Sequence, residues 1–301
     1  MYHCFLGWLC TIFVNKIYYH RSIIMNELSA FNRFTSELKE NDQLMPVLFI
    51  GHGSPMNGIE DNLFSRRWKQ LAKEIPVPKA VLVISAHWLS KGTRITAMDF
   101  PETIHDFGGF PQELFDVQYR VPGDPVLARE TASIIQSAHL ELDHDWGLDH
   151  GAWTVIRQMY PEANIPVLQL SIDYTKGPKY HYDLARELFS LRKKGVLIVG
   201  SGNMVHNLRM AAWNRLNDEE YGYDWAIQMN DQFKNLINNG QHDKLIQYES
   251  LGREALLAIP TPEHYWPLIY TLGLKGSKDD ISFFNDKVVA GSLTMTSVKF
   301  G

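Results

Sequence analysis

Residues 45–54 read MPVLFIGHGS, and this stretch holds the features that decide the fold. The run Met45–Ile50 is short, apolar and ends at a glycine, as expected of a strand buried on both faces of a parallel sheet. His52 then lies between two glycines, which allow a sharp turn and a close backbone approach to a ligand. The stretch therefore predicts a buried strand that delivers a histidine to one edge of a sheet.

Further apolar runs of the same kind follow along the chain. They are too short for typical helices and are bounded by turn residues, which favours strands over buried helices. These runs are Ala80–Ser85, Ile165–Ser171 and Val196–Gly200.

Segments bounded by residues that typically begin or end a helix lie between these runs or after them. Asp124 precedes a proline, the pattern of a capped helix start, and a second helix is expected from about Pro178 to Lys194, before Gly195. A third helix is expected between Asp224 and Gly240. A fourth is expected to start at Thr261-Pro262, to kink at Pro267 and to end near Gly273.

The order of these segments predicts an α/β fold. We expect one domain over residues 45–301, with a central, mostly parallel sheet flanked by helices. Ser292–Val298 is expected to form a final strand, and a sheet edge is the place considered for it. In such folds ligands bind beyond the carboxyl ends of the strands, so the site is expected there.

Residues 1–44 differ from the rest and are interpreted as an N-terminal extension. The apolar run Phe5–Val14 is too short to span a bilayer, and no basic residue precedes it as in a signal peptide. We expect either a disordered segment or a chain whose true start is Met25, with residues 26–44 as a polar lead-in.

Composition narrows the function classes. The chain has 301 residues, 45% of them hydrophobic, and a net charge of -5 without a basic run, so neither a nucleic acid nor a membrane is expected as a partner. The two cysteines of the chain are Cys4 and Cys10. The rest of the chain therefore has neither a disulfide framework nor a thiolate metal site. We expect a reducing, cytoplasmic location. Composition leaves the oligomeric state open.

Histidines follow three of the four predicted strands. They are His52, His87 and His206, whereas Asp173 follows the third strand. Because the carboxyl ends of parallel strands share one edge of a sheet, these histidines are expected to lie together.

Other histidines have a weaker setting. His264 is expected in the first turn of a helix, where the helix dipole favours the neutral imidazole that a metal needs. His150 precedes a glycine in an expected tight loop and is either a ligand, an acid–base residue or a structural histidine. His105 lies in a glycine-rich loop, and Trp88 either lines an aromatic pocket or packs in the core. The remaining histidines are expected at the surface: His3, His20, His139, His144, His181 and His242.

No nucleotide-binding glycine motif, phosphate loop or His-Glu-x-x-His motif is present. Residues 51–55 lack the Gly-x-Ser-x-Gly pattern of a serine nucleophile turn. The residues themselves therefore predict a thiolate-free, histidine-rich site for Zn²⁺ or Fe²⁺.

Six motifs together resemble the class III extradiol ring-cleaving dioxygenases, and most of all the 4,5-DOPA extradiol dioxygenase branch of bacteria and betalain-making plants. The similarity covers about residues 45–301 in one register and does not extend to residues 1–44. The motifs are GHGSPM at 51–56, SAHW at 85–88, HDFGGFP at 105–111, DHGAW at 149–153, SGNMVHN at 201–207 and PTPEHY at 260–265.

This resemblance implies a non-haem Fe²⁺ enzyme that opens a catechol such as L-DOPA with O₂ to a muconic semialdehyde. It implies that His52, His87 and His264 bind the metal. It implies that His206 is the catalytic base and leaves open whether His206 also binds the metal. It implies that His150 is an acid–base residue. His105 and Trp88 are expected to contact the substrate.

An all-histidine site departs from the two-histidine, one-carboxylate set common in ferrous oxygenases, and Glu263 is the carboxylate beside His264. Such a site would also bind Zn²⁺ readily. Two alternatives to a dioxygenase therefore stay open, a zinc-dependent hydrolase and a non-catalytic metal-binding protein. The physiological substrate also stays open.

Overall fold

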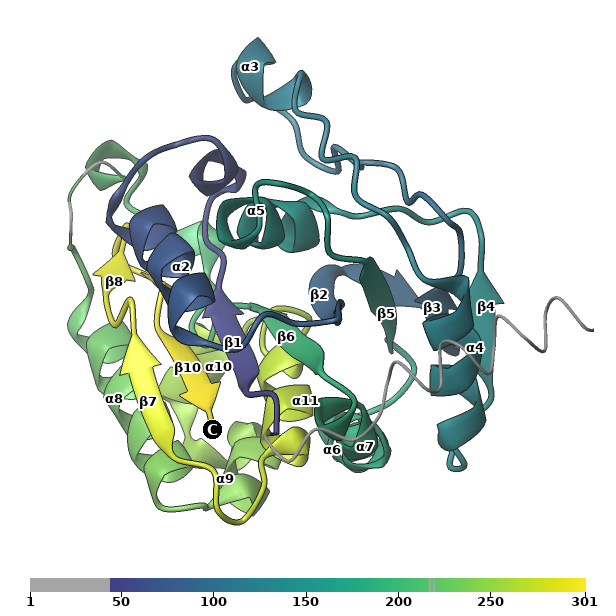
Figure 1. The fold of residues 1–301 in the computed structure, drawn as a ribbon. Helices are drawn as coiled ribbons and strands as arrows, with labels where there is room; N and C mark the ends of the chain where they lie inside the picture. Colours follow the sequence, from purple (N-terminus) through teal and green to yellow (C-terminus); the bar gives the residue numbers. More distant parts are fainter. Residues whose placement is uncertain (1–43, 217, 219) are drawn as a thin grey trace, which may run out of the picture. The chain divides into compact units, whose positions relative to one another are not determined.

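A computed structural model describes residues 44–216, 218 and 220–301 of the protein (Figure 1). The expectations for the N-terminal extension therefore lie almost wholly outside the described residues.

A large mixed sheet forms the centre of the described chain. Its eight strands have the order β4-β3-β5-β2-β6-β1-β10-β7, and β8 and β9 form a separate two-stranded ladder. The strands are β1 Val47–Gly51, β2 Ala80–Ser90, β3 Thr93–Thr96, β4 Leu140–Asp143, β5 Val167–Asp173, β6 Val196–Gly202, β7 Ile281–Phe284, β8 Val288–Val289, β9 Leu293–Thr294 and β10 Ser297–Phe300.

The four central strands are parallel and coincide with the four apolar runs. β6 pairs in parallel with both β1 and β2, and β2 pairs in parallel with β5. All residues of β1, β5 and β6 are buried, which explains their continuous apolar sequences. The predicted fold class, an α/β domain with a mostly parallel sheet, is confirmed.

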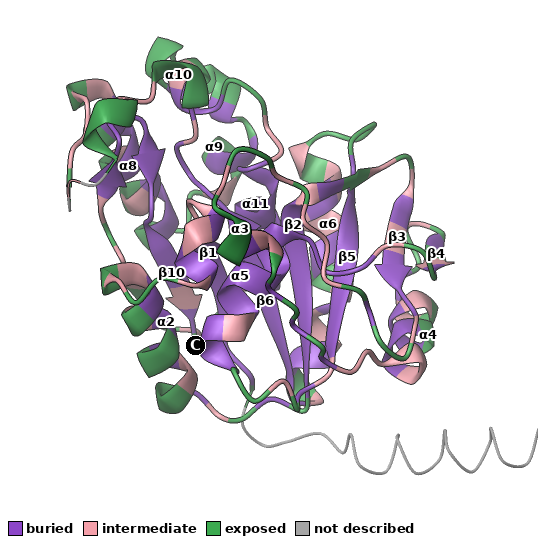
Figure 2. Ribbon diagram, turned by 90° about the horizontal axis from the view of Figure 1, so that it is seen from above, coloured by how far each residue is buried: buried purple, intermediate pink, exposed green. Residues whose placement is uncertain are grey.

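Helices and short 3-10 turns cover both faces of this sheet, so that the strands lie buried at the centre (Figure 2). α2 and α5 pack together over one face, and α11 packs with α6 against β6, β1 and β2. The helical elements are η1 Pro55–Gly58, α2 Leu63–Glu74, α3 Gln112–Phe115, α4 Pro125–Ile134, α5 His150–Met159, α6 Pro178–Glu187, α7 Phe189–Lys193, η2 Leu208–Met210, η3 Trp213–Arg215, α8 Asp224–Asn238, α9 His242–Ile246, η4 Tyr248–Leu251, α10 Arg253–Ala258 and α11 Trp266–Leu274.

The helix expected from Thr261 begins later than predicted. α11 starts at Trp266, and Pro267 lies in its first turn, where its missing N–H leaves no hydrogen bond unmade. The expected kink at Pro267 is therefore wrong. His264 lies in the turn before the helix rather than in its first turn.

Two other boundaries also differ from the prediction. Ser292–Val298 is not one strand, because β9 pairs back onto β8 and the chain then enters the large sheet as β10. β10 lies between β1 and β7, so the expected edge position is wrong (Figure 1). The helix expected over 178–194 divides at Leu188 into α6 and α7.

Candidate active site

Three imidazoles converge at the carboxyl ends of the parallel strands. His52 directly follows β1, and His87 lies in the last part of β2. Their Nε2 atoms are 3.2 Å apart. The ring of His264 lies 5.5 Å from that of His52 and 4.9 Å from that of His87, between centroids. Ligand atoms of all three lie within 4.8 Å of one another, so this group could hold a metal ion.

His264 reaches this group because the loop before α11 packs directly on the end of β6. The backbone N–H of Asn203 donates to the carbonyl of His264 at 2.8 Å. A Cβ added to Gly202 would lie 2.2 Å from that carbonyl oxygen, so only glycine permits the contact. His264 lies more than 60 residues after Gly202 and Asn203 in the sequence, so their contact depends on the tertiary fold and could not be predicted from sequence pattern.

Ser201 fixes the ring orientation and tautomer of His52. The hydroxyl of Ser201 donates to the carbonyl of Gly151 at 2.6 Å, and the same oxygen lies 3.0 Å from Nδ1 of His52. Since the hydroxyl hydrogen is already used, Ser201 must accept a hydrogen bond from Nδ1–H. The Nε2 lone pair of His52 is then free to face His87 and a bound metal.

The described residues fit a metal. With metal–nitrogen bonds of about 2.0–2.1 Å, two ligands at a tetrahedral angle lie about 3.4 Å apart, close to the separation of the two Nε2 atoms. Nδ1 of His264 is buried without a hydrogen-bond partner among the described residues. Glu263 is not part of the three-histidine group and accepts a hydrogen bond from Thr261.

Burial keeps the three imidazoles uncharged. It lowers the pKa of His52 and of His264 well below the usual value, and it lowers the pKa of His87 to about 3. Neighbouring histidines lower each pKa further, because protonating one ring disfavours a positive charge on the next. Neutral imidazoles are the form that binds a metal.

His150 lies beside this group and is held by Asp106. Its ring centroid is 3.8 Å from that of His87. Its Nδ1 lies 2.9 Å from Oδ2 of Asp106, and its backbone N–H donates to Oδ1 at 2.8 Å. Burial would raise the pKa of Asp106, but the bonds from His150 lower it overall, so the carboxylate stays ionised.

The tight loop expected at His150 is instead the start of a helix. His150 is the first residue of α5, and Asp149 caps this helix by accepting a hydrogen bond from the N–H of Ala152. Gly151 is required for packing rather than for a turn, because an added Cβ would lie 2.4 Å from Oγ of Ser85 and 2.9 Å from Cδ2 of His87.

His206 lies next to the three-histidine group but outside it. Its ring stacks on that of His264, with centroids 3.6 Å apart and an angle of 8° between the planes. Burial lowers its pKa to about 4 despite the opposing effect of Glu263. The ring is therefore neutral near pH 7 and able to accept a proton.

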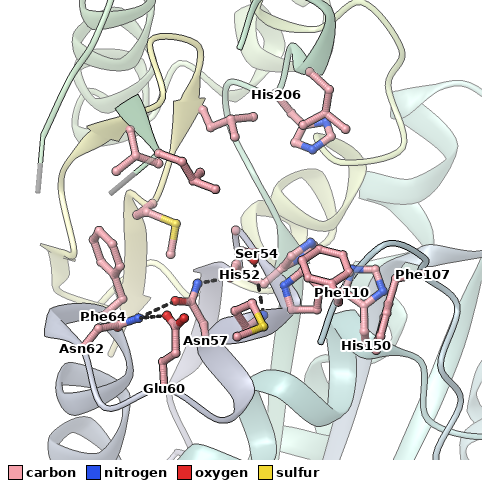
Figure 3. A pocket seen from close by; sticks show the side chains of 18 of the residues that line it. His52, Ser54, Asn57, Glu60, Asn62, Phe64, Phe107, Phe110, His150 and His206 are labelled. Carbon is pink, nitrogen blue, oxygen red and sulfur yellow. Dashed lines mark hydrogen bonds between the residues drawn. The ribbon is translucent and has the colours of Figure 1, made fainter. Parts of the chain in front are cut away.

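A cavity of about 390 Å³ opens on all five of these histidines. Phe107 and Phe110 line it on the side of His150, and His206 lies apart from them (Figure 3). The rings of Phe107 and His150 are 5.6 Å apart, which gives this end of the cavity an aromatic wall. A cavity of this size is ordinary for a small-molecule site.

His105 and Trp88 do not line this cavity. Nε2 of His105 lies 3.0 Å from the carbonyl oxygen of Val117, and this bond ties the glycine-rich loop to the chain after α3. Trp88 stacks on Trp146 at 5.5 Å and lines a separate, open depression. Trp88 therefore lies at a different opening from the one that His87 lines. The geometry thus gives no support to a substrate contact for either residue.

One expected surface histidine is buried. His181 on α6 is 0% exposed and its Nδ1 lies 3.0 Å from the hydroxyl of Tyr270, whereas His139 and His144 are exposed as expected. His181 and Tyr270 are 89 residues apart in the sequence, so this contact could not be predicted from local pattern. His3 and His20 lie outside the described residues.

Known proteins are similar in sequence to this chain. The family model described as the catalytic LigB subunit of aromatic ring-opening dioxygenase matches residues 46–301. A 4,5-DOPA dioxygenase extradiol of Escherichia coli K12 is 45% identical over 262 residues, which cover 85% of this chain and 95% of that protein. The 4,5-DOPA dioxygenase extradiol of Beta vulgaris is 34% identical over 266 residues, 86% of this chain and 97% of its own.

A solved structure is also similar. The crystal structure of an uncharacterized Escherichia coli K12 protein superposes with a TM-score of 0.72 at 38% identity, covering 85% of this chain and all of that one.

The fold, the histidine site and the sequence similarity together define the protein as an extradiol ring-opening dioxygenase. Enzymes of this class are metal-dependent and act on an aromatic substrate with O₂. The chain belongs to the LigB family of aromatic ring-opening dioxygenases. No helix within the described ranges is both long and apolar enough to cross a membrane.

Proposed function

We propose that the enzyme cleaves the ring of a catechol such as L-DOPA at the extradiol 4,5 position and forms a muconic semialdehyde, 4,5-seco-DOPA. The observation that carries this proposal is the convergence of three neutral imidazoles on a cavity that His150 and His206 also line. The names of the relatives from Escherichia coli and Beta vulgaris support L-DOPA as the first substrate to test.

His52, His87 and His264 would hold Fe²⁺ as the catalytic metal. When bound, the metal would acidify a catechol hydroxyl and bring the catechol and O₂ together. Affinity favours Zn²⁺ over Fe²⁺ at an all-nitrogen site, so purified protein is expected to carry some Zn²⁺ that does not support turnover.

His206 is assigned as the base that accepts a proton from the substrate. It lines the cavity, and its lowered pKa leaves an unprotonated ring nitrogen near pH 7. Its ring stacks on that of His264, which supports a role beside the metal-binding group.

His150 is assigned as the acid–base residue on the other side of the site. Because Asp106 accepts the hydrogen bond from Nδ1–H, the neutral ring presents an unprotonated Nε2. His150 can therefore accept a proton and donate it again later in the reaction.

Oxygen uptake tests this proposal. Protein stripped of metal and reloaded anaerobically with Fe²⁺ should consume O₂ with L-DOPA and produce a yellow semialdehyde, and the Zn²⁺-loaded protein should not. His206→Ala should lower kcat about 100-fold or more, as expected for loss of a proton-transfer residue. The matched variant His139→Ala changes an exposed histidine and should retain activity.

If the Fe²⁺-loaded protein binds metal but consumes no O₂ with any catechol, the proposal is contradicted. Turnover of an ester or amide by the Zn²⁺ form would then favour a hydrolase. Absence of turnover in both forms would favour a metal-binding protein.

A further inference from the structure

The cavity has a polar end formed by the segment that follows His52. η1 begins three residues after His52, and the chain then runs through Glu60 to the start of α2. Asn57, Glu60 and Asn62 line the cavity together at this end (Figure 3). They lie apart from Phe107 and Phe110 in this view.

Hydrogen bonds join this end to the metal-binding group. Nδ2 of Asn57 donates to the carbonyl of His52 at 2.9 Å. Nδ2 of Asn62 donates to Oδ1 of Asn57 at 2.8 Å and to Oε2 of Glu60 at 3.2 Å. The carboxylate of Glu60 is thus held in a defined position relative to His52.

The charged residues that line the cavity are acidic. Among the described lining residues there is no lysine or arginine, and the carboxylates are those of Glu60 and Asp218. Asp218 is neutralised by Arg215, whose Nε lies 2.6 Å from Oδ2. Within the described ranges no basic group forms an ion pair with Glu60, so its charge is available to a ligand.

An unpaired carboxylate at this end of the cavity attracts a positive ligand group and repels a negative one.

We propose that Glu60 determines substrate specificity by binding the ammonium group of an amine-bearing catechol. The inference rests on the proposed ring cleavage and makes it more specific. With the catechol hydroxyls at the histidines, the substituent on the opposite side of the ring extends toward the cavity's polar end. The substrate class is then catechols with a cationic side chain, and a side-chain carboxylate is not required.

The expected preference is small, because Glu60 is exposed and exposed ion pairs are weak. We expect kcat/KM to be about two- to fivefold higher for an amine-bearing catechol than for a neutral one of similar size. A catechol with a carboxylate side chain should be poorer than the neutral compound. Both differences should decrease as ionic strength rises.

Three substrates test this inference: dopamine, 4-ethylcatechol and 3,4-dihydroxyphenylacetate. They should be compared with the Fe²⁺-loaded wild type, with Glu60→Gln and with Glu113→Gln, which changes an exposed carboxylate that does not line the cavity. Glutamine keeps an oxygen for Asn62 but removes the charge. In Glu60→Gln the ratio of kcat/KM between dopamine and 3,4-dihydroxyphenylacetate should approach one, through KM, and Glu113→Gln should keep the wild-type ratio.

The ratio separates a specificity role from a structural one, because a structural defect lowers turnover of all three compounds equally. An unchanged ratio in Glu60→Gln, or a wild-type preference for the carboxylate compound, would overturn the assignment of Glu60 while the ring-cleavage proposal stands. No turnover of any of the three compounds would overturn the proposed function itself. Anaerobic calorimetric titration of dopamine and 3,4-dihydroxyphenylacetate then tests charge selection independently, and equal Kd values would overturn the inference.

Discussion

Asp106 accepts two hydrogen bonds from a single residue, His150, one from its backbone N–H at 2.8 Å and one from its ring Nδ1 at 2.9 Å. The same carboxylate lies 3.7 Å from Nδ1 of His87. Asp106 therefore connects the loop that carries Phe107 to the start of α5 and to the end of β2. Both the tautomer and the position of His150 depend on it.

Asp106→Asn should impair proton transfer by His150. The two N–H groups of His150 reach different oxygens of the carboxylate. In the amide one of these oxygens is replaced by an NH2 donor, so one hydrogen bond is lost and the tautomer of the ring is no longer fixed. We expect kcat with L-DOPA to fall about 100-fold, the lower end of typical acid–base contributions. Stopped-flow oxygen uptake, with metal content measured on the same sample, checks this.

The matched control is Asp116→Asn, an exposed aspartate in the same region whose carboxylate bonds only to Gln112 among the described residues. Its kcat should remain within about twofold of the wild type, as usual for a surface change. A wild-type kcat in Asp106→Asn would show that His150 does not depend on this carboxylate.

Ser201→Ala should weaken metal binding. The variant removes the hydrogen bond that orients His52, and loss of such a partner typically lowers metal affinity about 10- to 100-fold. Competition with a chromophoric chelator measures the change. Ser171→Ala, which removes a buried hydroxyl from β5 outside the cavity, should leave metal affinity unchanged. Equal affinities of Ser201→Ala and the wild type would contradict the role of Ser201.

Gly202→Ala should displace His264. The added Cβ would meet the carbonyl oxygen of His264 at 2.2 Å, so the loop before α11 must shift. We expect a loss of about 1–3 kcal/mol in the free energy of unfolding, together with weaker metal binding. Gly108→Ala, where an added Cβ meets nothing within 4 Å, is the control for urea unfolding and metal titration. A fully stable Gly202→Ala that binds metal normally would contradict the close packing at this position.

His181 should make the protein sensitive to acid. Burial lowers the pKa of His181 to about 4 in the folded protein, against an ordinary value of 6.5, so the unfolded chain binds this proton more readily. Stability is then present above pH 6.5 and is lost as the pH falls from there through about 4. This single group should account for a loss of about 2 to 3 kcal/mol near pH 4.5.

Urea unfolding near pH 7 and near pH 4.5 measures this loss. His181→Gln should show a smaller decrease than the wild type, and His139→Gln, which changes an exposed residue, should show the same decrease. A decrease in His181→Gln as large as in the wild type would show that His181 does not titrate as its burial implies.

The sequence predicted what depends on local pattern. Short apolar runs became β1, β2, β5 and β6, because strands buried on both faces must be apolar throughout. His52, His87 and His206 could be found because the ends of parallel strands share one edge.

What depends on tertiary contact could not be found in the same way. Asp106 and Ser201 were not singled out, because their partners His150 and His52 are 44 and 149 residues away in the chain. His181 lies in no motif and was therefore expected at the surface, but α11 packs on α6 and its Tyr270 supplies the partner of His181. Trp88 was expected in a substrate pocket, yet it is buried, stacks on Trp146 and lines a separate depression.

Turnover of L-DOPA under ¹⁸O₂ by the Fe²⁺-loaded enzyme, with mass spectrometry and NMR of the product, tests the central claim most directly. The account predicts that both atoms of one O₂ molecule enter the product and that the ring opens between carbons 4 and 5, outside the pair of hydroxyl-bearing carbons. Incorporation of label from water instead of O₂, or opening between the two hydroxyl-bearing carbons, would contradict it.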